Sequence, residues 1–440
     1  IKMCGIIISD LVIPEDYKFI KNRGPDYTNT VTYNNYMFIH FLLHLTGDKT
    51  YQPIIDNNVA YIFNGEIYNY KELNTESKSD IYSIIKTYNS YGEKFFKYLD
   101  GEFVIVIFDF NENKIFIVSD LFKTKPLFFN INKNIVISSY ESECIKIKNQ
   151  QYFEINPNEA LIFDLNTKKM IKKEPFYIFN LQQIKESYDD YCIMLEKAIL
   201  KRYPEKTIPL IPLSSGHDSG AIVCCLQKYN KPFIAISINK NEDNEVMKQR
   251  KELLKEKLIL IDLQSHEKTY WNNYLNNFCE PFIWDWTYHP KMSDYRPNGF
   301  TMGSMLGKSK IFNFIKKKNP AINICYSGIG ADEVMALNSF YSQGYGNVDI
   351  FPKQLESVFP WPNFYNGSMK NYLKGDEYIG GTFSFETRYP FCDKDLVQEF
   401  LYLTSELKNS FNGNNYKPAI SYYLQKENFP YQCNKYGFNV

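Results

Sequence analysis

The first 175 residues consist of short apolar runs separated by polar, turn-forming residues. These runs are CGIIIS, NVAYIFN, GEFVIVIFDF, KIFIVSD, KPLFFNI, NIVISSY and ALIFDL. Asn-rich stretches at 111–113 and 132–134 separate neighbouring runs. Apolar runs bounded by turn residues are typical of β-strands, and only one helical stretch, SDIYSIIKTYNSYG, interrupts them. The pattern therefore predicts two packed sheets with few helices.

The pattern changes near residue 185, where helical periodicity begins. Amphipathic stretches appear as YDDYCIMLEKAILKRY, GAIVCCLQKY and EVMKQRKELLKEK. Short apolar strands lie between them, namely IPLIPLSS, FIAISIN, KLILIDL and INICYSG. Strands that alternate with helices indicate a parallel α/β sheet. With KKEPFYIFNLQQIKES as the linker, the sequence predicts two domains, 4–180 and 186–440.

Composition narrows the class of protein. The chain has 440 residues, of which 44% are apolar, and its 50 basic and 50 acidic residues give a formal net charge of zero. Nothing in this balance favours an electrostatic partner such as nucleic acid or a membrane surface. Nine cysteines without a C-x-x-C pair and five histidines argue against a zinc or disulfide framework. We interpret the start, IKMCGIIISD, as a strand and not a signal peptide, which predicts a cytoplasmic protein.

Candidate chemistry begins with Cys4, which lies between Met3 and Gly5. If Met3 is removed, Cys4 carries a free α-amine, and such an amine can act as the base for its own thiol. The small Gly5 lets a substrate carbonyl approach closely. Taken alone, Met-Cys-Gly favours a buried strand cysteine, so the hypothesis depends on the other motifs of this half of the chain.

Further motifs follow Cys4 in a definite order. They are RGPD at 23–26, QPI at 52–54, NGEIYNY at 64–70, SD at 79–80, DGEFVIVIFD at 100–109 and SDLFKTKPLFF at 119–129. In this order and spacing they resemble the class II glutamine amidotransferase domain of the asparagine synthetases. The resemblance implies an αββα sandwich of antiparallel sheets, of the Ntn-hydrolase type.

The same resemblance implies a glutaminase site. Cys4 would be the nucleophile, and Asn64 with the backbone N–H of Gly65 would form the oxyanion hole. The chemistry requires such a hole because attack on an amide places negative charge on oxygen. Glu66 and Asp80 would hold the α-ammonium group of glutamine, although Asp80 also fits a helix N-cap.

Two features depart from this family. Its members usually carry an Arg that grips the glutamine α-carboxylate, and here the matching stretch is His44-Leu45-Thr46. A charged His44 can pair with a carboxylate, but not as a bidentate fork. In addition, Ile1-Lys2 precede Met3, and Cys4 has no free amine if these residues stay attached. The mechanism therefore predicts their removal.

The segment IPLIPLSSGHDSGAIV at 208–223 predicts a strand, a Ser/Gly turn and a helix. A helix start with free N–H groups after such a turn is an anion cradle. Asp218 could bind Mg²⁺ beside it, and Ser214 and Ser219 could bond phosphate oxygens. No G-K-[ST] is present, so this is not a Walker loop, and an ordinary serine-rich N-cap remains the alternative.

This loop resembles the S-G-G-x-D-S loop of ATP pyrophosphatases, which release AMP and pyrophosphate. Ser215 replaces one glycine of that motif, and His217 occupies its variable position. The ATP-binding residues that the resemblance implies are Leu213, Ser214, Gly216, Asp218, Ser219, Ile238, Ser327 and Gly328.

A second loop, YSGIGADEV at 326–334, resembles the family's S-G-E-G-[SA]-D-E. It makes Asp332 the second candidate Mg²⁺ ligand, after Asp218. Ile329 stands where asparagine synthetases carry a Glu that is thought to assist the attack of ammonia. An isoleucine cannot transfer a proton, so this chain differs most from the asparagine synthetases at the acceptor step.

Two closing segments extend the resemblance to about the whole chain. FETRYPFCDKDLV at 385–397 resembles E-A-R-V-P-F-L-D, which places Glu386 beside the acceptor site and makes it a candidate base. KPAISYYL at 417–424, with KYGF at 435–438, resembles the family's closing helix and tail. Lys417 would then neutralise the charge that develops on phosphate.

The leading hypothesis is a glutamine-dependent, ATP-consuming carbon–nitrogen ligase that amidates a carboxylate, with aspartate as the first candidate. Its cofactors would be ATP and Mg²⁺ and its partners small molecules, while a homodimer stays open. An amide ligase for another acid or amine is the first alternative. A non-catalytic relative is the second, favoured by His44, Ser215 and Ile329.

Overall fold

The computed structural model describes residues 4–45, 47–146, 151–240, 242–285, 295–296, 303–337, 350–413 and 416–432. Residues 1–3, Thr46 and the predicted KYGF tail at 435–438 lie outside this set. The chain forms two compact units. Unit 1 comprises Ile1–Ile178, Phe278–Pro281 and Gly380–Glu386, and unit 2 comprises Phe179–Asn277, Phe282–Ile379 and Thr387–Val440.

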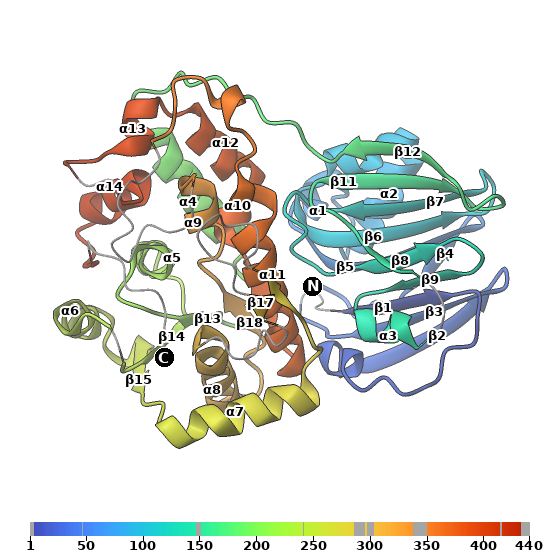
Figure 1. The fold of residues 1–440 in the computed structure, drawn as a ribbon, viewed down its shortest axis with the longest axis horizontal. Helices are drawn as coiled ribbons and strands as arrows, with labels where there is room; N and C mark the ends of the chain where they lie inside the picture. Colours follow the sequence, from blue (N-terminus) through green and yellow to red (C-terminus); the bar gives the residue numbers. More distant parts are fainter. Residues whose placement is uncertain are drawn as a thin grey trace. The chain divides into compact units, whose positions relative to one another are not determined.

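Unit 1 is built on two six-stranded antiparallel sheets, which lie face to face (Figure 1). The first sheet has the order β10 (Phe153–Glu154), β8 (Phe128–Ile131), β9 (Ile135–Ser138), β1 (Gly5–Ser9), β3 (Tyr36–Leu42) and β2 (Tyr27–Tyr33). The second sheet has the order β12 (Met170–Pro175), β11 (Glu159–Asp164), β7 (Lys114–Ser119), β6 (Gly101–Asp109), β5 (Val59–Ile67) and β4 (Ile54–Asp56). The predicted sandwich is confirmed.

Alternation along the strands creates the core between these sheets. Every second residue of β1 and β5 faces inward, since Ile6 and Ile8 join one buried cluster with Ala60 and Ile62. Residues of the other parity face outward. Tyr61, for example, packs edge-on against Tyr88 of α2 at a ring-centroid distance of 5.8 Å.

Short helices cover the outer faces of the sandwich. On the second sheet these are α1 (Tyr70–Leu73), α2 (Ile81–Tyr91) and the 3₁₀ segment η2 (Gly92–Tyr98). The first sheet carries the 3₁₀ segment η1 (Ile20–Arg23) and α3 (Glu141–Ile145). The helix predicted from SDIYSIIKTYNSYG is α2, whereas β2 and β3 lie outside the predicted strands.

Unit 2 contains a five-stranded sheet with the order β15 (Leu258–Ile261), β14 (Ile234–Ile238), β13 (Leu210–Pro212), β18 (Ile324–Tyr326) and β19 (Glu386–Arg388). The pairs β13–β14, β14–β15 and β13–β18 are parallel, as the alternation of strands and helices predicts. Figure 1 shows α5 on one side of this sheet and α8 on the other. A separate pair of short strands is formed by β16 (Trp284–Asp285) and β17 (Tyr295–Arg296).

The remaining elements of this half are helical. The α-helices are α4 (Asp189–Lys201), α5 (His217–Lys228), α6 (Asn244–Leu254), α7 (Ser265–Phe278), α8 (Gly303–Lys318), α9 (Ala331–Met335), α10 (Pro362–Tyr365), α11 (Gly367–Thr382), α12 (Lys394–Tyr402), α13 (Ser405–Asn409) and α14 (Pro418–Lys426). Three 3₁₀ segments accompany them, η3 (Lys255–Lys257), η5 (Leu355–Ser357) and η6 (Pro390–Cys392). Within the described residues, no helix is both long and apolar enough for a bilayer span.

Candidate functional site

Cys4 lies at the entrance to β1, and its side chain is completely buried. Its backbone N–H donates a hydrogen bond of 2.9 Å to Oδ1 of Asn64, which lies on β5 in the facing sheet. The amide Nδ2 of Asn64 is buried and has no hydrogen-bond partner in the described part of the chain. Sixty residues apart in sequence, the predicted nucleophile and the predicted oxyanion donor therefore meet.

Gly65 holds the backbone next to this pair in a conformation that only glycine adopts easily. Its φ is +132°, and a Cβ built there would lie 2.0 Å from the carbonyl oxygen of Glu102 on β6. The two strands pair Gly65 with Phe103 in register. Gly65 therefore allows β6 to pass close to the backbone that carries Asn64.

Two acidic side chains lie near the C-terminal end of β5. Glu66 and Asp80 are both buried, and Oδ2 of Asp80 accepts a long hydrogen bond of 3.4 Å from the N–H of Ile67. Asp80 occupies the N-cap position of α2 but accepts no capping hydrogen bond. Its carboxylate thus faces the end of β5 instead of the helix that it precedes.

His44 is directed into its own loop. Its Nε2 lies 3.0 Å from the carbonyl oxygen of Gly47, and its backbone N–H donates to Oδ2 of Asp26 at 2.6 Å. The tautomer of the ring decides whether Nε2 donates in this contact. The predicted role of His44 toward a carboxylate remains a prediction.

In unit 2, the loop between β13 and α5 wraps around two hydroxyl groups. The N–H of Ser214 donates to Oγ of Ser219 at 3.1 Å, and the two Oγ atoms lie 3.2 Å apart. The N–H of Gly216 donates to Oγ of Ser214 at 3.2 Å. The hydroxyls thus converge at the N-terminal end of α5, where backbone N–H groups of a helix attract anions.

Lys417 pairs with two other predicted site residues, Asp218 and Asp332. Its Nζ lies 2.5 Å from Oδ2 of Asp218 and 2.8 Å from Oδ1 of Asp332, and its own side chain is almost fully buried. Burial lowers the pKa of Lys417, but the two carboxylates raise it more, so the net direction is upward. The lysine is therefore a fixed cation between two carboxylates.

The second loop approaches the first one closely. A Cβ built on Gly328 would lie 2.7 Å from Cβ of Asp218, so a larger residue would separate the two loops. Ser327 donates from its Oγ to Oδ2 of Asp376 at 2.7 Å, and Asp376 also pairs with Lys308. The predicted residues Leu213 and Ile238 are buried beside these loops, at the ends of β13 and β14.

Comparisons with known proteins agree with this arrangement. Residues 3–190 match the family model described as a glutamine amidotransferase domain. This part of the chain is therefore similar to glutamine amidotransferase domains. The chain as a whole is similar to proteins named as asparagine synthetases, over up to 93% of its length.

Two of these relatives span most of the chain. Asparagine synthetase [glutamine-hydrolyzing] 2 of Arabidopsis thaliana is 22% identical over 93% of this chain and 74% of its own length. Putative asparagine synthetase [glutamine-hydrolyzing] 1 of Methanocaldococcus jannaschii is 24% identical over 92% of this chain and 81% of its own. Among solved structures, glutamine phosphoribosylpyrophosphate amidotransferase from B. subtilis is 16% identical. The match covers 55% of this chain and 64% of that chain, with a TM-score of 0.28.

The structure adds one residue to the amidotransferase site. Arg23 is fully buried, donates from Nε to the carbonyl oxygen of Cys4 at 3.2 Å, and lies 3.3 Å through Nη1 from the hydroxyl of Tyr140. Arg23 opens the RGPD motif, so the sequence contained the signal, although motif order alone assigned it no role. Asp376, by contrast, lies in no motif of the sequence analysis.

Glu386 belongs to β19, the strand next to β18, which leads into the second loop. Its side chain is buried. Ile329 lies in the second loop, where its N–H donates to Oγ of Ser327 at 3.4 Å. The role of Glu386 beside the acceptor remains a prediction.

Proposed function

We propose that this amidotransferase is an ATP-dependent carbon–nitrogen ligase that transfers the amide nitrogen of glutamine to a carboxylic acid, with aspartate as the first candidate. The observation that carries the proposal is the buried, unpartnered Nδ2 of Asn64 beside Cys4. A buried donor without an acceptor costs free energy, and it persists where a ligand supplies the acceptor. A tetrahedral oxyanion is such an acceptor.

The first half-reaction follows from these groups. The thiolate of Cys4 attacks the side-chain amide carbon of glutamine, and the developing oxyanion accepts hydrogen bonds from Nδ2 of Asn64 and the N–H of Gly65. The α-amine of processed Cys4 takes the proton of its thiol and becomes an α-ammonium group. Collapse of the intermediate breaks the C–N bond, and the leaving nitrogen takes that proton from the α-ammonium group and departs as ammonia. Water then hydrolyses the thioester to glutamate. Glu66 and Asp80 supply negative charge for the α-ammonium group of the substrate.

In the second half-reaction the acceptor carboxylate attacks the α-phosphorus of ATP, and pyrophosphate leaves. Ser214, Ser219 and the N-terminus of α5 would hold the phosphates, with Lys417 neutralising the charge that develops on them. Ammonia then attacks the acyl-adenylate, and AMP leaves.

Asp218 and Asp332 fit a hard divalent cation, because their carboxylates already share one cation, the Lys417 ammonium. When bound there, Mg²⁺ would neutralise phosphate charge. The two carboxylates would hold it and keep Lys417 oriented toward the same phosphates. The proposal places this reaction in the cytoplasm.

A second candidate, an amide ligase for another acid or amine, is favoured by one observation. Ile329 offers no proton acceptor in the loop where a base would receive the proton from the attacking amine. Such a ligase would need a different base, with Glu386 as the candidate, because any attacking amine loses a proton after it attacks.

The test separates the two halves of the reaction. Cys4→Ala should abolish glutamate release from glutamine while pyrophosphate release with ammonium, ATP and the acceptor continues. A Cys144→Ala variant is the matched control, because Cys144 is an equally buried cysteine of the same unit. Release of ADP and phosphate instead of AMP and pyrophosphate would refute the assignment of unit 2.

A panel of carboxylic acids identifies the acceptor. Pyrophosphate release that depends on aspartate supports the leading assignment, and dependence on a different acid supports the second candidate.

A further inference from the structure

Ser215 stands in the phosphate-binding loop where the resembling motif has glycine, and the structure shows where its hydroxyl goes. Its φ is not positive, so serine fits this position without backbone strain. Both the N–H and the Oγ of Ser215 donate to one oxygen, Oε2 of Glu242, at 2.5 and 2.7 Å. The side chain that replaces glycine therefore makes a charge-assisted contact.

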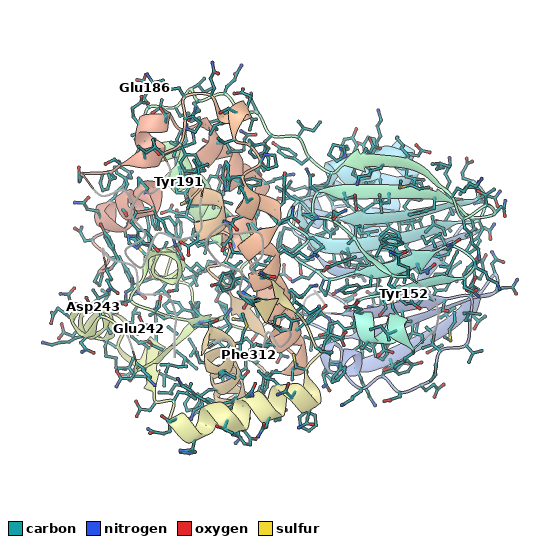
Figure 2. The ribbon with its side chains drawn as sticks, in the orientation of Figure 1. Tyr152, Glu186, Tyr191, Glu242, Asp243 and Phe312 are labelled. Carbon is teal, nitrogen blue, oxygen red and sulfur yellow. The ribbon has the colours of Figure 1, made fainter. Side chains whose placement is uncertain are left out.

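Glu242 belongs to the segment between β14 and α6, next to the helix N-cap Asp243. Figure 2 shows these two residues side by side at the start of α6. The N–H of Asp243 donates to Oγ of Ser215 at 3.2 Å. Ser215 is thus bonded to two consecutive residues of this segment.

A second segment, near the end of the described chain, also contacts this serine. The N–H of Gln432 donates to the carbonyl oxygen of Ser215 at 3.0 Å, and Oε1 of Gln432 lies 2.8 Å from Oγ of Ser215. The side-chain oxygen and nitrogen of Gln432 can exchange places without changing the fit. Two separate segments of unit 2 therefore converge on one loop residue.

Arg250 on α6 balances the charge of this cluster. Its buried guanidinium donates to the carbonyl oxygens of Ser214 and Gly216, the latter at 2.9 Å. A Cβ built on Gly220 would lie 2.4 Å from Nη2 of Arg250, so a glycine in α5 makes room for the cation. Burial raises the pKa of Glu242 and lowers that of Arg250 to about 9, as expected for two ions removed from water.

The charges explain how a carboxylate can sit beside a site for a polyanion. A lone Glu242 would repel ATP phosphates, whereas Arg250 compensates its charge. Because Arg250 takes the carbonyl oxygens of Ser214 and Gly216, these dipoles point away from the site. The hydroxyls of Ser214 and Ser219 lie at the N-terminal end of α5, where the helix N–H groups favour an anion.

We propose that Glu242 is a positioning residue for nucleotide binding, which holds Ser215 so that the hydroxyls of Ser214 and Ser219 face the phosphates. This inference rests on the proposed function, since it requires unit 2 to bind ATP. In this interpretation Ser215 attaches the loop to Glu242, and its presence in place of glycine does not indicate a non-catalytic relative.

The experiment measures equilibrium binding of Mg²⁺ with an ATP analogue that carries a methylene group between the α- and β-phosphorus atoms. The full chain is titrated as the unmodified protein and as Glu242→Ala, Glu242→Gln and Ser215→Gly. Glu245→Ala is the matched control, because Glu245 is an exposed carboxylate on α6, three residues after Glu242, and accepts a hydrogen bond from Gln249.

We expect Glu242→Ala to weaken binding about tenfold, the scale of one lost charge-assisted hydrogen bond. Glu242→Gln keeps an acceptor for Ser215 and should recover most of the affinity, which a role in folding alone does not predict. Ser215→Gly loses only the hydroxyl contacts and should lie between the two. It also keeps the test decisive if Glu242→Ala does not fold.

Unchanged binding by Glu242→Ala and Ser215→Gly would overturn the inference, because the contact would then not position the loop. Tighter binding would also overturn it, because the carboxylate would then compete with phosphate for the loop. Failure of the unmodified protein to bind the analogue would instead refute the proposed function. The two failures are distinguished by the unmodified protein alone.

Discussion

Asn64 gives the sharpest test of the glutaminase site, because its two side-chain ends have separate tasks. Oδ1 accepts the hydrogen bond from Cys4, and Nδ2 is buried without a partner in the described chain. Asn64→Asp is isosteric, so it preserves an acceptor for Cys4 and replaces the donor by a second oxygen. Asn64→Ala removes both ends.

The size of the effect follows from the chemistry of the donor. Loss of one oxyanion-hole donor typically costs about 10²–10³ in kcat, or about 2.7–4 kcal/mol of transition-state stabilisation. Asn64→Asp should lose at least this much, because a carboxylate repels the oxyanion. Asn64→Ala additionally loses the bond to Cys4, whose net contribution is about 1 kcal/mol, a further factor of about five.

The assay is the initial rate of glutamate release at saturating glutamine, paired with pyrophosphate release when ammonium replaces glutamine. Ammonium-dependent activity should survive in both variants, because ammonia bypasses the glutaminase site. Asn130→Asp is the matched control, since Asn130 is another buried strand asparagine of unit 1, with Nδ2 bonded to the carbonyl oxygen of Gln151. Glutamate release by Asn64→Asp within tenfold of the unmodified rate would show that Nδ2 does not stabilise the oxyanion.

Three further changes test other parts of the structure. Gly65→Ala should lower the free energy of unfolding by about 2 kcal/mol or more, because the new Cβ meets the Glu102 carbonyl at a positive φ; an unchanged midpoint in urea contradicts this. Burial raises the pKa of Glu280 to about 7, against the opposing effect of its bonds from Ser142. Between pH 4.5 and 7 the folded chain therefore keeps a proton on Glu280 that the unfolded chain releases. The free energy of unfolding should fall by about 3 kcal/mol over this range, and Glu280→Gln should lose this contribution; equal slopes of the two proteins in urea titrations at several pH values would argue against it. Asp218→Asn should stop pyrophosphate release but spare glutamate release, because an amide does not balance the charge of Mg²⁺; persistent release would remove Asp218 from the site.

The sequence by itself determined the elements and most of the chemistry. Apolar runs bounded by turn residues located β1, β5, β6, β7, β8, β9 and β11, because alternation between a packed face and an exposed or helix-covered face is a local property. The contiguous motifs NGEIYNY and SSGHDSG contained the candidate residues for the same reason, since a strand end or a helix start is encoded within a few residues. Strand β2 was not predicted because YTNTVTY has no continuous apolar run. Strand β3, YMFIHFL, has an apolar run interrupted only by His40 and was not predicted either.

Only the tertiary structure decided which of these residues meet. Asn64 reaches Cys4 across 60 residues because two sheets pack face to face, and Lys417 reaches Asp218 across 199 residues because α14 returns to the loop after β13. The bonds from Glu242 and Gln432 to Ser215 depend likewise on loop closure. Such contacts depend on the register of sheets and the path of connections, and a periodicity read over a few residues carries no information about either. The sequence thus determined what chemistry was present, while the fold decided its partners.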